Sequence, residues 1–256
     1  MGRTRISRRR FLELTGSAAA AAAWRARGGE GGTSPPNILL AIADDWSWPH
    51  AGIAGDPVVR TPAFDRVARE GVLFDNAFVS SPSCTPSRGA LLTGQWHWRL
   101  EEGANLWSIL PAKFPVYPDL LEEAGYVVGK TRKGWGPGPD TGGGRTRNAA
   151  GPNFRSFADF LANRPQGKPF CFWLGSSDPH RPYKKGSGVA SGLDPQAVRV
   201  PGCLPDTPEV RSDICDYFVE VSRFDADVGE ALRLLEEAGE LANTIVAVTS
   251  DNGMPF

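Results

Sequence analysis

Long apolar runs and blocks of like charge are both missing from this chain. Its 28 basic and 29 acidic residues leave a net charge of −1, and no like-charged block suggests a nucleic-acid-binding tail, so no nucleic-acid partner is expected. The apolar stretch near the N-terminus, residues 14–24, is too short and too weakly hydrophobic for a stable membrane span. Methionine is scarce at two, but eight tryptophans, 41 % hydrophobic and 22 % charged residues are typical of a folded globular protein rather than a disordered one.

The N-terminus has the pattern of a targeting segment. Residues 7–12 read Ser-Arg-Arg-Arg-Phe-Leu and precede an alanine-rich stretch, which resembles a twin-arginine export signal. We therefore expect residues 1–32 to be an export signal and linker for the twin-arginine (Tat) machinery, and the protein to be periplasmic or secreted. A merely basic leader is the alternative. Seven arginines and two glutamates give these residues +5, so the remainder carries −6 and must capture any anion through local Arg and Lys side chains.

The rest of the chain, residues 33–256, is long enough for one large α/β domain. Apolar runs predict strands at residues 37–43, 71–79, 126–129, 170–174 and 244–249. Helices are predicted at residues 61–70, from Cys84 onward, and at 118–124, 154–163 and 209–238. Alternating strands and helices predict an α/β fold with a mainly parallel central sheet and helices on both faces.

Polar side chains directly follow the first and last of these strands. Asp44 and Asp45 come after the first strand, and Asp251 and Asn252 come after the last. Ligands of open α/β sheets bind at the carboxyl ends of the strands. Adjacent carboxylates repel each other unless a cation neutralises them, and carboxylate and amide oxygens suit Ca²⁺ or Mg²⁺ better than zinc. Each pair could be an ordinary polar turn, but its position after a strongly apolar strand favours a cation site.

Cys84 begins the segment Cys-Thr-Pro-Ser-Arg-Gly-Ala-Leu-Leu-Thr-Gly, residues 84–94. A thiol ahead of a Pro-Ser-Arg turn and an apolar run predicts a helix N-terminus, where free N–H groups and the helix dipole attract an anion. Taken alone, it could be a structural cysteine or a thiolate whose pKa the helix lowers.

The same segment, Cys-x-Pro-Ser-Arg followed by Leu-Thr-Gly, resembles the signature of the type I sulfatases. Further segments agree in their order: Asp44-Asp45, Gly-Val-Leu-Phe-Asp-Asn-Ala at 71–77, Gly125-Tyr126, Asp-Pro-His-Arg-Pro-Tyr at 178–183 and Asp-Asn-Gly at 251–253. The resemblance implies an alkaline-phosphatase-like sulfatase catalytic domain over residues 33–256. It also implies that a formylglycine-generating enzyme oxidises Cys84 to formylglycine, whose hydrated aldehyde attacks sulfur.

Roles for individual residues follow from this resemblance. The metal would be Ca²⁺ rather than Mg²⁺, with the ligands Asp44, Asp45, Asp251, Asn252 and modified Cys84. Arg88 would orient and stabilise the formylglycine hydrate, and Lys133 would bind a sulfate oxygen. His180 would contact the sulfate or protonate the leaving group, although it could instead be a structural histidine in a proline-rich turn.

The sequence departs from the family pattern in two places. Sulfatases often have a histidine two positions after the lysine that corresponds to Lys133, and here that position is Trp135. Lys130 is the alternative lysine if the register of this segment is shifted. The resemblance also implies a further basic site residue and a smaller C-terminal subdomain, and we expect both to be missing from a chain that ends at Phe256.

Residues 178–181 and 251–256 look most similar to the heparan N-sulfatase (sulfamidase) branch, so the expected substrate is an N- or O-sulfated sugar or other sulfated small molecule. One alternative is a phosphate or phosphonate ester hydrolase of the same superfamily. Another is an inactive, truncated relative that keeps only part of the site.

The remaining cysteines are expected to be structural. Cys171 lies in an apolar run and is predicted to be a packed thiol. Cys203 and Cys215 flank a short loop and could pair in an oxidising compartment, which the sequence leaves open.

Overall fold

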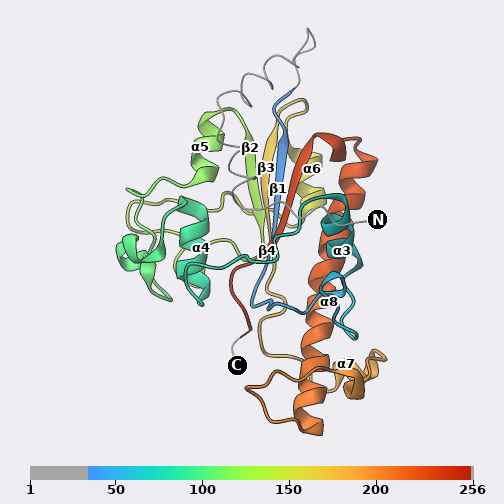
Figure 1. Cartoon of the computed structure of the whole chain (residues 1–256). Coiled ribbons are helices and arrows are strands. Elements are labelled where there is room, and N and C mark those ends of the chain that lie inside the picture. Colours follow the sequence, from blue (N-terminus) through green and yellow to red (C-terminus); the bar gives the residue numbers. More distant parts are fainter. Residues whose placement is uncertain (1–33, 255–256) are drawn as a thin grey trace. The chain divides into compact units, whose positions relative to one another are not determined.

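A four-stranded parallel sheet is the centre of the structure, a computed structural model that describes residues 34–254 (Figure 1). Its strands are β1 (Asn37–Ala43), β2 (Val127–Thr131), β3 (Phe170–Gly175) and β4 (Thr244–Ser250). Their order across the sheet is β2-β3-β1-β4, and every neighbouring pair is parallel. The strand β1 lies between two neighbours and is almost wholly apolar, as expected of a strand that is covered on both faces.

Six α-helices and several short 3₁₀ segments connect or follow the strands. The helices are α3 (Pro62–Glu70), α4 (Cys84–Thr93), α5 (Tyr117–Glu123), α6 (Phe157–Asn163), α7 (Ser187–Ala190) and α8 (Pro208–Glu237) among the described residues. The 3₁₀ segments are Gly52–Ala54, His97–Arg99, Glu101–Ala104, Pro195–Ala197 and Leu241–Asn243.

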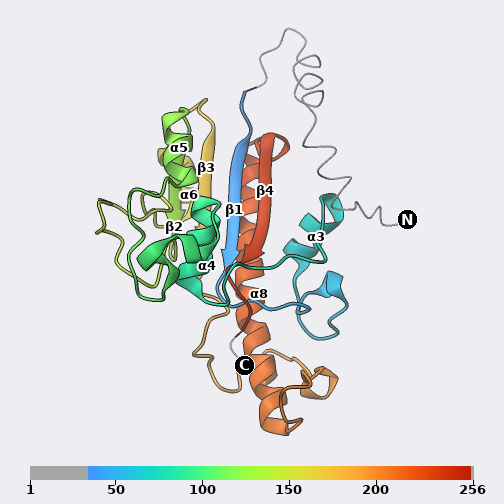
Figure 2. The same cartoon turned by 60° about the vertical axis from the view of Figure 1, so that its left-hand side comes forward.

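One face of the sheet packs against α6 and α8. Successive side chains of a strand point to opposite faces, and the β1 side chains Leu39, Ala41 and Ala43 lie in one core cluster with Phe160 of α6 and Phe224 of α8. The helix α3 adds partly buried apolar side chains to the same cluster, and Figure 2 shows α3 on the opposite side of the sheet from α4 and α5.

The other face of the sheet packs against α4 and α5. Ile42 of β1 and Trp173 of β3 form a second core cluster with Leu92 of α4 and Val116, the residue before α5. Helices therefore cover both faces of a parallel sheet, which confirms the predicted fold class.

The helix α8 is 30 residues long, which corresponds to about 45 Å. Its start is set by Thr207, whose side chain accepts a hydrogen bond from the Val210 N–H, and by Pro208 at the first helical position. The predicted apolar stripe is confirmed, because its members are all buried: Phe218, Val221, Phe224, Val228, Leu232 and Leu235. The N-terminal half of α8 also carries a third core cluster, which includes Val58, Val59 and Val198.

Two expectations need correction or a boundary change. Residues 71–79 form bends and irregular backbone rather than the predicted strand. Within residues 34–254 they have no partner strand, because β4 and β2 are the outer strands of the sheet and neither pairs with this segment. Its apolar side chains, such as Phe78, therefore stay exposed. The helix predicted from residue 154 begins at Phe157, since the Ser156 side chain caps it by accepting from the Asp159 N–H.

The cysteines Cys203 and Cys215 are both free thiols, one exposed and the other buried on α8. The Cys171 thiol is buried in β3, as predicted. The predicted export signal and linker, residues 1–32, lie outside the described residues. Within residues 34–254, no helix combines the length and the apolar character that a membrane crossing requires.

Candidate metal and catalytic centre

All four strands deliver polar side chains to one edge of the sheet. Asp44 follows β1 directly, Lys133 comes two residues after β2, Asp178 three residues after β3, and Asp251 directly after β4. The strands are parallel, so their carboxyl ends meet at the same edge. The predicted convergence of the two acidic pairs is therefore present in the structure.

The five predicted metal ligands form one buried cluster. One ligand atom each from Asp44, Asp45 and Cys84 lies within 4.8 Å of the others, and the Cys84 Sγ is 3.5 Å from Asp44 Oδ1. Asp251 Oδ1 accepts a hydrogen bond from the Asp45 N–H at 3.1 Å. The Asn252 amide donates to Asp45 Oδ1, so β1 and β4 hold both acidic pairs together.

The chemistry of this cluster fits a hard divalent cation. Burial, followed by the nearby charge of Asp251, raises the pKa of Asp44 to about 6, and burial also raises the pKa of Asp45. The Asn252 Oδ1 atom is buried and has no hydrogen-bond partner within residues 34–254. A cation that prefers oxygen ligands would bind this amide oxygen together with the crowded carboxylates beside it.

Arg88 connects this cluster to the helix α4. Its side chain is fully buried, its Nε donates to Asp251 Oδ2 at 2.7 Å, and its Nη2 lies 3.6 Å from Asp44 Oδ1. Its Nη1 donates to the backbone carbonyls of Lys133 at 2.9 Å and Gly134 at 3.0 Å. Burial raises the pKa of Asp251, but the charges of Arg88 and Lys133 outweigh that effect and hold it below its ordinary value.

Lys133 is the lysine that reaches the cluster. Its Nζ lies 2.5 and 2.6 Å from the two carboxylate oxygens of Asp44. Lys130 is buried elsewhere, with its Nζ bonded to the Arg132 carbonyl and to Asn153. The structure therefore places Lys133, and not the alternative Lys130, beside the predicted metal ligands.

The backbone of Lys133 is held at the end of β3. Its carbonyl oxygen accepts a hydrogen bond from Trp173 Nε1 at 3.0 Å. It also passes so close to Gly175 that a Cβ atom at that glycine would lie 2.0 Å from it. Only a glycine permits this approach, because real Cβ contacts are essentially never shorter than 3.0 Å.

Cys84 begins α4, as the sequence predicts, and its side chain is buried. Burial, followed by the charges of Asp251 and Asp44, raises the pKa of the Cys84 thiol to about 12. With these neighbours the thiol is protonated at neutral pH, despite its place at a helix N-terminus.

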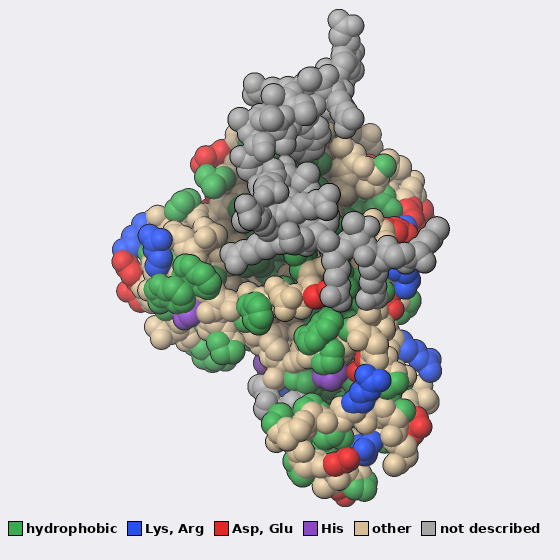
Figure 3. All heavy atoms as spheres, viewed as in Figure 1, with side chains coloured by type: hydrophobic (Ala, Val, Ile, Leu, Met, Phe, Trp, Pro, Cys, Tyr) green, Lys and Arg blue, Asp and Glu red, His purple; other side chains and the backbone are tan. Residues whose placement is uncertain are grey.

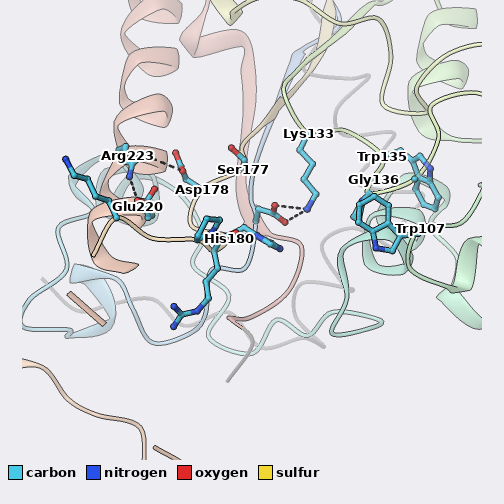
Figure 4. Close-up of a pocket in the computed structure, with 15 residues that line it drawn as sticks. Trp107, Lys133, Trp135, Gly136, Ser177, Asp178, His180, Glu220 and Arg223 are labelled. Atoms are coloured by element: carbon cyan, nitrogen blue, oxygen red, sulfur yellow. Dashed lines mark hydrogen bonds and ion pairs between the residues drawn. The ribbon is translucent and has the colours of Figure 1, made fainter. Parts of the chain in front are cut away.

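A cavity of about 740 Å³ opens above the cluster (Figure 4). Asp44, Lys133 and His180 line it, whereas Cys84 is not among its lining residues and lies against Asp44. The His180 Nε2 is 3.6 Å from Asp45 Oδ2, and its ring is half exposed. Trp135 also lines the cavity at the position where a histidine is frequent in the resembled family.

Sequence reasoning missed several residues that line this cavity, above all Glu220, Arg223 and Trp107. A signal for Glu220 was available, because it is three residues after Tyr217 and four before Phe224, which places a carboxylate on the buried face of α8. Trp107 follows a 3₁₀ segment and gave no periodic signal.

The chain belongs to the sulfatase family, whose model matches residues 36–256. It is 32 % identical to the human N-sulphoglucosamine sulphohydrolase over 267 residues, which cover 87 % of this chain and 51 % of the human protein. It is 30 % identical to the N-acetylgalactosamine-6-sulfatase of Canis lupus familiaris over 291 residues, 92 % of this chain and 55 % of that protein. The chain thus spans about half the length of these curated relatives.

Solved structures confirm the fold. A structure of BT4656 in complex with its substrate D-glucosamine-2-N,6-O-disulfate matches with a TM-score of 0.66 at 19 % identity, over 86 % of this chain and 66 % of the other. The phosphonate monoester hydrolase of Agrobacterium radiobacter matches with a TM-score of 0.61 at 15 % identity, over 85 % of this chain and 62 % of the other. At these identities the likeness concerns the fold alone.

Proposed function

We propose that this chain carries the nucleophile and metal part of a sulfatase site and hydrolyses an O-sulfate ester or a sulfamate on a sugar. The observation that carries the proposal is the convergence of Asp44, Asp45 and Cys84, whose ligand atoms lie within 4.8 Å of one another, with Lys133 beside them. Membership in the sulfatase family supports it. The match to an N-sulphoglucosamine sulphohydrolase supports an amino sugar as the substrate class.

The cluster would hold Ca²⁺, with the ligands Asp44, Asp45, Asp251, Asn252 and residue 84 in its formylglycine form. The cation would withdraw charge from the sulfuryl oxygens, and the hydrated aldehyde would supply a hydroxyl to attack sulfur. The hydrated formylglycine has two hydroxyl groups, whereas a thiol offers only its sulfur. Deprotonation of the second hydroxyl would let the sulfate leave and the aldehyde form again.

The chain's own residues position and protonate the substrate. Lys133 donates to a sulfate oxygen once the substrate replaces part of its contact with Asp44. Arg88, held by Asp251, keeps its Nη2 directed at the cluster and stabilises negative charge at residue 84. His180, half exposed at the cavity, gives its proton to the sugar oxygen or nitrogen as the bond from that atom to sulfur breaks.

Two partners and a location belong to the same proposal. A formylglycine-generating enzyme would modify Cys84, and the twin-arginine machinery would export the chain to the periplasm or beyond. The arginine-rich pattern at residues 7–12 supports the export route.

Parallel turnover assays test the proposed function. The chain is produced together with a formylglycine-generating enzyme and given N-sulfoglucosamine, 4-nitrophenyl sulfate and 4-nitrophenyl phosphate, with Cys84→Ala as the control. We expect sulfate release from both sulfated compounds and none from the control. Faster release of phosphate than of sulfate would favour the phosphate or phosphonate ester hydrolase, and no release of either would favour an inactive relative.

A further inference from the structure

The cavity has two side walls of different chemistry (Figure 4). Trp107 and Trp135 lie on one side of Lys133, and Asp178, Glu220 and Arg223 lie on the other. The first wall offers aromatic surface, and the second offers two carboxyl groups and a guanidinium. Neither wall is needed to bind a sulfate group alone, since Lys133 and the proposed cation site would bind it.

Glu220 differs from an ordinary surface carboxylate. It forms an ion pair with Arg223 three residues later on α8, and its side chain is only 6 % exposed. A matched pair on the same helix, Glu230 and Arg233, has the same spacing, and both side chains are about half exposed. Burying a carboxylate costs free energy, so the buried Glu220 calls for a reason that the exposed Glu230 does not.

The neighbours of Glu220 make it both a donor and an acceptor. Burial, followed by a hydrogen bond with Asp178, raises the pKa of Glu220 to about 7, while Arg223 Nη1 lies 4.0 Å from Asp178 Oδ1. The two carboxyl groups lie in hydrogen-bond contact, and the guanidinium adds further N–H donors. A sugar ring presents hydroxyl and N–H groups that both donate and accept, which this wall can match.

The opposite wall suits the apolar face of a ring. Trp107 is 74 % exposed at the edge of the cavity, and its backbone adopts a left-handed φ of 59°, which is uncommon for a bulky residue. Binding sites are typically lined by aromatic surface with a few placed polar groups that set orientation. Trp107 and the charged wall together form such a site around Lys133.

We infer that Glu220, with Asp178 and Arg223, is the specificity-determining wall that binds the ring substituents next to the sulfated position of a sugar, while Trp107 covers the face of the ring. This inference rests on the proposed function and deepens it: the substrate is a sulfated pyranose with a free hydroxyl or N–H beside the sulfate-bearing atom. A small aryl sulfate or free sulfate would contact Lys133 and would not contact this wall.

Equilibrium binding tests the inference without turnover when the chain is produced in a host that lacks a formylglycine-generating enzyme, so that residue 84 keeps its thiol. Titration calorimetry with Ca²⁺ present compares N-sulfoglucosamine with inorganic sulfate on the full chain, on Glu220→Gln and on the matched control Glu230→Gln. We expect Glu220→Gln to weaken N-sulfoglucosamine binding about tenfold more than it weakens sulfate binding, the size of one lost charged hydrogen bond. We expect the control to bind both probes as the unaltered chain does.

A second variant covers the case in which Glu220→Gln does not fold. Arg223→Gln changes a half-exposed side chain and should show the same selective loss. An equal loss for the two probes, or no loss for N-sulfoglucosamine in a folded variant, would overturn the inference while leaving the proposed function intact. If the unaltered chain binds neither probe, the proposed function itself fails, and the inference that rests on it fails too.

Discussion

Arg88 and Asp251 form a fully buried ion pair, in which Arg88 Nε lies 2.7 Å from Asp251 Oδ2. The pair joins the helix that begins with Cys84 to the end of β4, and the same guanidinium donates to the backbone of Lys133 after β2. One side chain thus fixes the relative positions of the predicted nucleophile, a predicted metal ligand and the predicted sulfate-binding lysine.

Replacing Arg88 with Met should therefore be strongly destabilising. The substitution leaves the Asp251 carboxylate buried without its cation, and breaking a buried pair in this way costs about 3–5 kcal/mol. Urea denaturation of the metal-free chain measures the free energy of unfolding. Arg233→Met, at an exposed pair on α8, is the control and should change it by less than about 1 kcal/mol. Equal losses in the two variants would contradict this role of Arg88.

Gly175→Ala should displace the Lys133 backbone. The added Cβ would lie 2.0 Å from the Lys133 carbonyl oxygen, and overpacking of this kind costs about 1–3 kcal/mol or more. Gly202→Ala is the matched control, because nothing lies within 4 Å of a Cβ at that position. We expect a lower urea midpoint and slower hydrolysis of 4-nitrophenyl sulfate for Gly175→Ala only. An unchanged midpoint in that variant would show that the Lys133 backbone can move aside freely.

The buried Glu220 should make stability depend on pH. Its pKa is about 7 in the folded chain against an ordinary 4.5, so the folded state holds a proton that the unfolded state releases between these values. The folded chain therefore loses stability as the pH rises from about 4.5 to 7, by up to about 3 kcal/mol from this group. Glu220→Gln removes the titrating group, so the variant does not lose this stability. Its free energy of unfolding, relative to that of the unaltered chain, should therefore increase as the pH rises over the same range. A difference that stays constant from pH 4.5 to 7.5 would contradict this assignment.

Calcium should stabilise the chain through the acidic cluster. A ligand that binds only the folded state adds about 2.7 kcal/mol at a concentration a hundredfold above its Kd, so Ca²⁺ should raise the thermal midpoint and chelation should reverse the rise. Asp45→Asn should abolish most of the effect, whereas Asp206→Asn, at an exposed ion pair, should preserve it. Mg²⁺ in a parallel titration tests the choice of metal. A rise that survives in Asp45→Asn would place the cation elsewhere.

The sheet and the meeting of Asp44 and Asp45 with Asp251 and Asn252 were predictable from local sequence because parallel strands bury both faces. Runs such as residues 37–43 and 170–174 are apolar throughout, and the residues that follow parallel strands must meet at one edge. Lys133 and His180 were predictable only through the family resemblance, since neither lies in a distinctive local pattern.

The cavity walls and the irregular segments could not be predicted in this way. Glu220 and Trp107 come together only through tertiary packing of α8 and a loop that are far apart in the chain. Residues 71–79 have the composition of a strand, yet strand formation depends on a pairing partner that local sequence does not reveal. The spacing of Cys203 and Cys215 likewise does not show that the helix α8 buries one thiol while the other stays exposed.

Mass spectrometry of the peptide that contains Cys84 is the most direct test of the central claim. The chain is produced with an active formylglycine-generating enzyme, and the peptide is compared with the same peptide from a host that lacks this enzyme. The account predicts an aldehyde in place of the thiol at residue 84 in the first sample, and sulfate release only from that sample. An intact Cys84 thiol in a preparation that still releases sulfate would contradict it.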